Sequence, residues 1–274
     1  MRKGISMLTD FKNWLILNGA SKNTADTYVA RISEVGSTLT LENWTKEGLD
    51  AFLTKIKQER KTSTFNNYLF AIKKYLIFQK KEIELPRSTR PPKILPESFT
   101  EEYFLHTMIP TIEQLVSGDI FKIKALLYFL FYTGLRISEI NDLKREHFDL
   151  KQRIVKVYIS KTKEERLVFY TKATKFHLEE YFNSEPEETN AFNMTSKAFQ
   201  ARLFLWKPHF EEINLHAHIF RHSYATHLLY NGVNLLSVGK LLGHKDIMTT
   251  QRYESLSIGQ MQEIYRAKID RRGK

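Results

Sequence analysis

The stretch HIFRHSYATHLL, residues 218–229, decides which kind of fold and site this chain can form. It predicts one helix that runs to Tyr230 and ends at Asn231-Gly232, a good helix stop. His218 and Arg221 stand at positions i and i+3, so they share one face of that helix. A lone histidine or arginine is more often structural, but this pair can converge on one anion.

A second cationic element precedes that helix in TGLRISEI, residues 133–140. The apolar run over residues 120–132 predicts a buried helix that stops at Gly134. Arg136 then falls at the start of a further helix, predicted over RISEINDLK, residues 136–144. Backbone N–H groups at a helix start also favour an anion, so the stretch predicts a second anion-binding point.

Two short apolar segments predict a β-hairpin between these helical elements. RIVKVYIS, residues 153–160, alternates apolar and polar residues as a half-buried strand does. KTKEE is a polar turn, and RLVFY, residues 166–170, is the returning strand. The hairpin therefore carries Lys161 at or near its tip, with Lys163 two residues further on.

A histidine and a tyrosine close this series in LLGHKDIMTTQRY, residues 241–253. His244 and Tyr253 are nine residues apart, with basic residues on both sides. A phenol is a poor nucleophile at neutral pH because its pKa is about 10. If Tyr253 takes part in chemistry, cations elsewhere in the chain must stabilise its incipient phenolate.

The first 80 residues show helical patterns only, and each pattern is explained by helix packing alone. Thr45 is a plausible N-cap for one of these helices, and Thr62 or Ser63 leads another. The apolar stripes comprise Leu8, Phe11, Trp14 and Leu15; Tyr28, Ile32 and Val35; Leu49, Phe52, Leu53 and Ile56; and Phe65, Leu69, Ile72 and Leu76.

A proline-rich stretch separates this part from the rest of the chain. ELPRSTRPPKILPES, residues 84–98, holds four of the seven prolines, and proline at this density favours an extended chain. We therefore predict a helical domain over residues 1–84, a linker over 85–97 and a second domain over 98–274. Ser98 and Glu101 resemble a capping box that begins the second domain, and further helices are expected over residues 172–182, 195–206, 235–242 and 247–253.

Composition limits the partners of the chain. The 274 residues contain no cysteine, which excludes disulfides, thiolate zinc sites and cysteine nucleophiles. The net charge of +11 suggests a polyanionic partner, most often nucleic acid. The apolar run over residues 125–132 is far shorter than the roughly 20 residues that span a bilayer. The start has no apolar region of signal-peptide length, so we expect a cytoplasmic protein without a membrane partner.

Five of the nine histidines lie between His216 and His244, which raises the question of a metal site. No HExxH motif or cysteine pair accompanies them, so no metal is expected. His222 and His227 are interpreted as packing or hydrogen-bonding residues. Tyr132, Tyr224 and Tyr230 are interpreted as structural.

In their order along the chain, TGLRISEI, a hairpin lysine, HIFRHSYATHLL, LLGHKD and TTQRY closely resemble the tyrosine recombinase, or phage integrase, family. The resemblance is greatest to compact Xer-type recombinases and short integrases. It implies a mainly α fold with a small β-sheet in the catalytic domain. It also implies a C-shaped, two-domain clamp on DNA, in which the N-terminal helices form the core-binding domain.

The resemblance assigns a role to each site residue. Arg136 and Arg221 would clamp the scissile phosphate, His218 would bind the same oxygens and assist proton transfer, and His244 would complete the cradle. Tyr253 would attack and form a 3′-phosphotyrosine.

Two further roles follow from the same resemblance. Lys161 would protonate the leaving 5′-oxygen, with Lys163 as the alternative acid because Ser160-Lys161-Thr162 replaces the usual Gly-Lys-Gly. Glu139 would support the site from behind. Fixed cations would serve in place of a metal, so no cofactor is expected.

The resemblance also predicts how the chain assembles. It implies that the partner is double-stranded DNA with inverted-repeat core sites and that the protein forms a homotetramer on this DNA. Whether a partner recombinase or an accessory protein is also needed stays open. No arm-binding domain is expected before residue 1, and SIGQMQEIYRAKI, residues 257–269, would be a tail helix that docks on a neighbouring subunit. The alternatives are a type IB topoisomerase-like nicking and resealing enzyme and a DNA-binding regulator without catalysis. The DNA sequence, and the choice between integration or excision and chromosome-dimer resolution, stay open.

Overall fold

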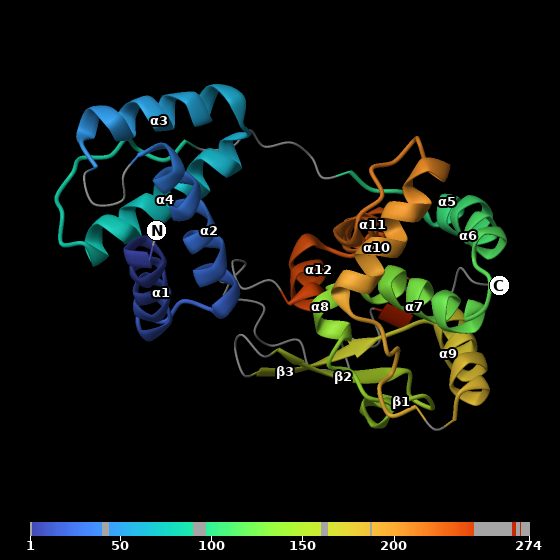
Figure 1. Cartoon of the computed structure of the whole chain (residues 1–274). Coiled ribbons are helices and arrows are strands. Elements are labelled where there is room, and N and C mark those ends of the chain that lie inside the picture. Colours follow the sequence, from blue (N-terminus) through green and yellow to red (C-terminus); the bar gives the residue numbers. More distant parts are fainter. Residues whose placement is uncertain are drawn as a thin grey trace. The chain divides into compact units, whose positions relative to one another are not determined.

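The chain folds into two compact units, Met1–Ile94 and Leu95–Lys274, in a computed structural model (Figure 1). The structure describes residues 2–39, 44–89, 97–159, 164–186, 188–243, 265–266 and 269. The division between the two units falls within the proline-rich stretch. Each unit has its own buried apolar cluster.

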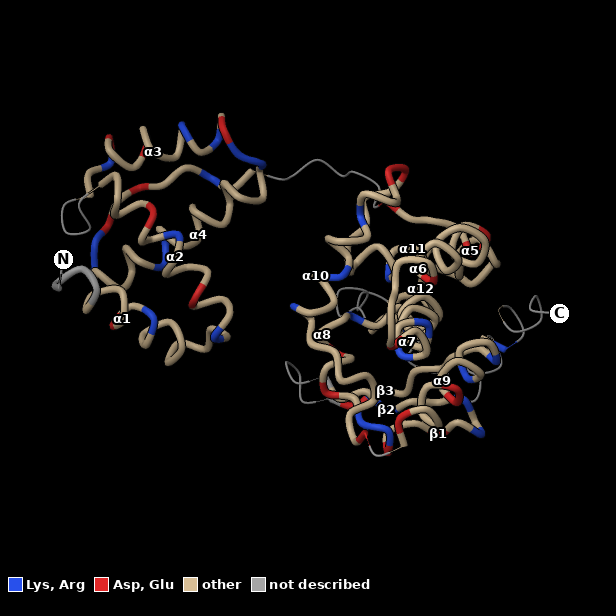
Figure 2. The backbone as a smooth tube through the Cα atoms, turned by 45° about the vertical axis from the view of Figure 1, so that its right-hand side comes forward, with Lys and Arg blue, Asp and Glu red and all other residues tan. Residues whose placement is uncertain are grey.

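The N-terminal unit consists of helices in all its described elements: α1 (Arg2–Leu17), α2 (Lys22–Thr38), α3 (Lys46–Glu59) and α4 (Thr62–Phe78). The Ser21 and Thr45 hydroxyls accept hydrogen bonds from the backbone of the first turns of α2 and α3, which fixes where these helices begin. The predicted Thr45 cap and the apolar stripes on α3 and α4 are confirmed. Figure 2 shows where Lys and Arg occur along these helices, and the lysines of α3 and α4 are exposed.

The C-terminal unit contains most of the helices and the sheet. Its first segment is α5 (Glu101–Tyr103), the π-helical η1 (Phe104–Met108) and α6 (Ile109–Leu115). The long helix α7 (Ile120–Thr133) leads to the short α8 (Ile137–Ile140) and η2 (Arg145–His147). After the sheet come α9 (Lys172–Ser184), α10 (Ser196–Trp206), η3 (Lys207–His209), α11 (Ala217–Tyr230) and α12 (Leu235–Leu242).

The sheet has three antiparallel strands in the order β1 (Phe148–Asp149), β2 (Ile154–Ile159) and β3 (Glu164–Phe169). Cross-strand partners lie on the same face, and the Val155–Val168 pair is buried. The hairpin prediction is confirmed, although β3 begins two residues earlier than expected. The sequence did not predict β1, which is only two residues long.

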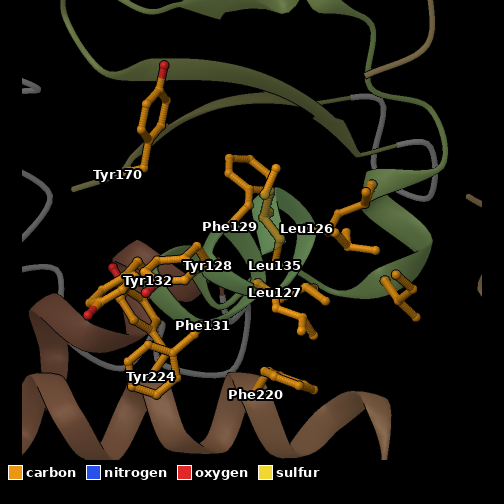
Figure 3. Close-up of a cluster of buried hydrophobic side chains, with 14 of the residues drawn as sticks. Leu126, Leu127, Tyr128, Phe129, Phe131, Tyr132, Leu135, Tyr170, Phe220 and Tyr224 are labelled. Atoms are coloured by element: carbon orange, nitrogen blue, oxygen red, sulfur yellow. The ribbon is translucent and has the colours of Figure 1, made fainter. Parts of the chain in front are cut away.

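Helix α7 forms the centre of the C-terminal unit because it is apolar on every side, and it packs against α9 and α11. In Figure 3 its side chains point both toward Phe220 and Tyr224 of α11 and toward Tyr170 beside the sheet. The helix ends at Gly134, whose φ of 61° is the left-handed conformation that glycine adopts without strain. The predicted buried helix and its stop are confirmed.

Two local predictions in this unit are wrong. The cap before α5 is Thr100, whose hydroxyl accepts the Tyr103 N–H, and not Ser98. Helix α8 stops at Ile140 because the backbone beyond it turns to pair with residues 189–191: the Ala191 N–H donates to Leu143 and the Arg145 N–H donates to Thr189.

The mainly α fold with a small sheet is confirmed. In the described residues, we find no helix with the length and hydropathy that a membrane crossing needs. The predicted helix over residues 247–253 lies outside the described residues.

Candidate active site

Arg136 lies at the N-cap of α8, directly after the turn that ends α7. Its backbone N–H donates to Glu139 Oε2 at 2.9 Å, and its Nη1 donates to Glu139 Oε1 at 3.0 Å. The Glu139 side chain is buried, whereas the Arg136 side chain is 37% exposed. The carboxylate therefore holds the Arg136 backbone N–H and one guanidinium nitrogen, and it leaves the rest of the guanidinium open to a ligand.

Glu139 binds a second arginine, Arg166 of β3. Arg166 Nη2 donates to Glu139 Oε2 at 3.1 Å, and both side chains are largely shielded from water. Two guanidiniums thus share one buried carboxylate, which links the short helix α8 to the sheet.

Arg221 lies on α11 and is 5% exposed. Its Nη1 donates to the Gly134 carbonyl at 2.8 Å, and its Nη2 donates to the Leu242 carbonyl at 2.8 Å. Arg221 therefore holds together the ends of α7 and α12, from which Arg136 and His244 follow. A guanidinium has five N–H donors, so three remain for other partners.

Burial lowers the pKa of Arg221 to about 10, and the positive charge of Arg136 lowers it in the same direction. Glu139 opposes this effect, and Arg166 adds to it. Arg221 stays charged at neutral pH, and the site holds more cations than Glu139 neutralises. Such a site favours an anion.

His218 lies in the first turn of α11, on the same helix as Arg221. Burial lowers its pKa, and the charges of His216, Arg136 and Arg221 lower it further. The imidazole is therefore neutral at pH 7 and can accept a proton. The predicted helical face shared by His218 and Arg221 is confirmed because α11 spans both residues.

Arg166 is the residue that sequence reasoning missed. The sequence placed Arg166 at the start of the returning strand but assigned it no role, yet Arg166 is paired across the hairpin with the buried Val157. It therefore occupies the inward row that also contains Val155 and Val168. A charge at an inward strand position needs a partner, and this alternation was the available signal.

Four predicted site residues lie outside the described residues: Lys161, Lys163, His244 and Tyr253. The elements beside them are described. Ile159 of β2 pairs with Glu164 of β3, so both lysines belong to the connection between these strands. Gly243, with φ of 69°, ends α12 and directly precedes His244.

The other histidines and tyrosines have separate places. His227 packs beside Phe131 and Tyr132, in agreement with the packing interpretation. Tyr132 and Tyr224 are buried, whereas Tyr230 is 84% exposed at the end of α11. In the described part of the chain, no group of three or more His, Asp or Glu side chains could hold a metal ion.

The described site is a cationic cradle with a neutral imidazole beside it. Guanidiniums held by buried hydrogen bonds can stabilise negative charge that develops on a bound anion. A neutral imidazole can exchange a proton in the same place. These features suit an oxyanion such as a phosphate group, held by fixed cations.

Comparison with known proteins identifies the class of protein. The profile of the phage integrase family matches residues 104–258. A tyrosine recombinase XerA of Saccharolobus solfataricus is 29% identical over 271 residues, which cover 93% of this chain and 90% of that protein. A tyrosine recombinase XerD of Shewanella oneidensis is 32% identical over 216 residues, which cover 73% and 70%.

Solved structures share the fold. A lambda integrase dimer bound to a core site has a TM-score of 0.67 at 15% identity, covering 92% of this chain and 98% of that one. The XerH recombinase bound to its difH substrate has a TM-score of 0.57 at 19% identity, covering 89% and 74%.

The chain belongs to the phage integrase family. It is a Xer-like tyrosine recombinase, an enzyme of site-specific recombination, as the resemblance in its sequence implied.

Proposed function

We propose that this recombinase cleaves and rejoins DNA strands through a covalent link to Tyr253, with Arg136, Arg221 and His218 around the scissile phosphate. One observation carries the proposal: two arginines from distant segments lie near one buried carboxylate, and their charges act on a histidine of α11 whose pKa they lower. A phosphodiester is an anion that gains charge in the transition state, so this site suits it.

Arg136 is the arginine that contacts the phosphate most directly. Its side chain is more than one-third exposed, and Glu139 holds it from the protein side. Arg221 is buried and contributes mainly through its fixed charge and its remaining N–H groups. Both charges also stabilise a phenolate, so Tyr253 does not need a low pKa before DNA binds.

Proton transfer completes the reaction. The Tyr253 hydroxyl attacks the phosphorus and gives up its proton, with His218 as the acceptor. The bond from phosphorus to the 5′-oxygen breaks, and Lys161 donates a proton to that oxygen. The products are a 3′-phosphotyrosine and a free 5′-hydroxyl, and the reverse reaction reseals the strand without ATP. Lys163 is the alternative acid.

DNA is held by both units in this proposal. The N-terminal unit contains 17 lysines and arginines against 9 aspartates and glutamates, and the C-terminal unit contains 25 against 22. The more basic unit supplies affinity, and the linker of residues 85–97 allows a clamp around the duplex. Phosphate contacts release counterions, so affinity should fall steeply with salt.

Recombination requires an assembly on two DNA sites. We propose a homotetramer on inverted-repeat core sites, with an accessory protein or partner recombinase as a further requirement to be tested. The similar proteins carry recombinase names, which favours strand exchange over topoisomerase-like relaxation or simple regulation. Tyr265 packs against Phe169 of the same chain, so exchange of the tail between subunits would have to replace this contact.

Covalent trapping tests the proposal. The protein is mixed with fragments from beside its own gene and from the host chromosome, each with a nick that lets the short product diffuse away. We expect a denaturation-resistant adduct that maps to Tyr253, and its absence in Tyr253→Phe, which should bind the same DNA normally. Wild-type protein that binds tightly without an adduct, with and without host extract, would contradict the proposal. The trapped ends would also give the DNA site.

A further inference from the structure

Arg166 is an unexpected charge inside the C-terminal unit. It occupies an inward position of β3, opposite the buried Val157 and one inward position before Val168. The side chain is 14% exposed. An arginine is costly at such a position unless its charge and N–H groups are matched, so it needs a specific partner.

Only part of that requirement is met within the described residues. Nη2 donates to Glu139, but Nε and Nη1 are buried and have no hydrogen-bond partner in the described part of the chain. The guanidinium lies directly against Gly243: a Cβ on that residue would overlap with Nη1 and lie 3.0 Å from the central guanidinium carbon. The unpartnered edge therefore faces the segment that leads into His244.

From this geometry we infer that Arg166 is a positioning residue, which holds Arg136 through Glu139 and sets the exit of α12 through its contact with Gly243. The inference rests on the proposed function of the site. Arg166 is too enclosed to be a phosphate ligand, because its free N–H groups do not reach solvent. It acts through the groups that it touches.

The position of Arg166 in the fold gives it a wider reach than one ion pair. It stands five residues after Lys161 on the strand that returns from the hairpin tip. One guanidinium thus joins three parts of the site: the hairpin, the Arg136–Glu139 pair and the end of α12. Arg221 bonds the Leu242 carbonyl in the same place, so two arginines fix the exit of that helix.

Single-turnover cleavage of the nicked DNA, at protein concentrations that saturate binding, tests the inference. We expect Arg166→Gln to lower the rate constant on the order of 10- to 100-fold, the loss typical of displacing a reacting group by about 1 Å. DNA affinity should change by less than about threefold, because Arg166 does not touch DNA in this inference. Lys156→Gln is the matched control, since it removes one exposed positive charge from the neighbouring strand.

A double-mutant cycle with Glu139→Gln identifies the route. If Arg166 acts through Glu139, the double variant should be less than about threefold slower than the slower single variant. Arg166→Lys should be intermediate, because one ammonium can reach Glu139 but cannot also fill the edge beside Gly243. A purely structural role would lower the melting temperature and the fraction of protein that reacts, and would leave the rate constant of the reacting fraction unchanged.

The outcomes separate this inference from the proposed function. A wild-type protein that forms no adduct overturns the proposed function itself. A wild-type adduct together with an unchanged rate constant in Arg166→Gln, or with fully multiplicative effects of the Arg166 and Glu139 changes, overturns the inference alone. If Arg166→Gln does not fold, Arg166→Lys decides: its rate constant must fall with unchanged affinity, and a wild-type rate constant rejects the inference.

Discussion

The two units of the molecule carry positive charge in opposite ways. The N-terminal unit has a net charge of +8 with nearly one residue in five basic, and many of these lysines are exposed, such as Lys55, Lys73 and Lys74. The C-terminal unit has a net charge of only +3, yet it encloses Arg166 and Arg221 around a buried carboxylate. The N-terminal unit therefore has the larger net charge, whereas the enclosed charges of the candidate site are in the C-terminal unit.

The physical consequence is a division of labour. Exposed charges are screened within about 10 Å at ordinary salt and contribute affinity that depends on salt. Enclosed charges act in a medium of lower dielectric, where geometry decides their effect and where water does not need to reorganise. Changes in the C-terminal site should therefore alter chemistry at constant affinity, and changes on the N-terminal surface should do the reverse.

Loss of Arg221 should have the largest effect. Arg221→Gln removes one of the fixed positive charges from the site and should lower the cleavage rate on the order of 10²- to 10³-fold. It also weakens the two bonds to the Gly134 and Leu242 carbonyls, at a cost of about 1–3 kcal/mol for each buried group left unpaired. Single-turnover cleavage and thermal unfolding measure the two effects.

The conservative Arg221→Lys variant is the control. It keeps the charge but can satisfy both carbonyls less well, so it should cleave slowly and melt between wild type and Arg221→Gln. If the Arg221→Gln protein cleaves at the wild-type rate, the enclosed Arg221 charge does not contribute to cleavage. The proposed division of roles between the two units would then be wrong.

We expect a substitution at Gly134 to act almost entirely through the stability of the fold. A Cβ there would overlap with Tyr224 and lie 2.7 Å from Leu242 Cδ2, in a backbone with φ of 61°. We expect Gly134→Ala to lower the free energy of unfolding by about 2–5 kcal/mol, from the left-handed backbone and from overpacking.

Gly19 in the N-terminal unit is the matched position for that change. It also has a positive φ, of 84°, but among the described residues no atom beyond its two neighbours in sequence lies within 4 Å of a Cβ there. Gly19→Ala should cost only the conformational part, about 1–2 kcal/mol. Chemical denaturation of both variants measures the difference, and equal costs would show that the tight contact at Gly134 relaxes.

These sites also show what the sequence could predict. The stripes on α3 and α4 and the hairpin follow directly from the apolar period, because burial forces that period on any helix or strand. His218 and Arg221 could be placed on one face because both lie on one helix. Their meeting with Arg136 depends on how three segments pack, which periodicity does not encode; the family resemblance, not the pattern, suggested it.

Each wrong or missed prediction has a specific physical cause. Thr100 caps α5 because its hydroxyl accepts a hydrogen bond from the Tyr103 N–H. Ser98 and Thr100 are both suitable caps, and the sequence does not decide between them. Helix α8 is short because residues 189–191, far along the chain, take the backbone bonds of residues 143–145. Arg166 was overlooked because a charge at the first residue of the predicted strand suggests an exposed position, and only the strand register with Val157 shows that it points inward.

The pH dependence of cleavage should report on His218. Burial, His216 and the two site arginines lower its pKa below the ordinary value of 6.5, so the neutral form persists to lower pH. Cleavage should stay constant from pH 8 down to about 6.5 and decline only below it. The same sign applies to stability: below pH 6.5 the unfolded chain binds the proton more readily, so the free energy of unfolding decreases.

The acid decline can be assigned with two variants on the same helix. His218→Asn should lose the decline at a reduced plateau, whereas His222→Asn should retain it, although burial also lowers the pKa of His222. Single-turnover rates under saturating protein exclude effects of pH on DNA binding. A wild-type decline that begins well above pH 6.5 would contradict a neutral His218 in the resting site.

The smallest effect on chemistry is expected at Lys73 and Lys74 of α4. Both are exposed, and neither forms an ion pair within the described residues. The double change Lys73→Gln and Lys74→Gln should weaken DNA binding and reduce the slope of log affinity against log salt by as much as about 2, if both contact phosphates. Single-turnover cleavage at saturation should stay within about twofold of wild type, because these lysines belong to the other unit.

Lys46→Gln is the control, since Lys46 is paired with Glu84 at 3.2 Å and has less charge to offer a phosphate. A slope unchanged by the double variant would place the DNA contacts on another face of the N-terminal unit, whereas a large loss of cleavage rate at saturation would show that the exposed charges of one unit also set the geometry of the other.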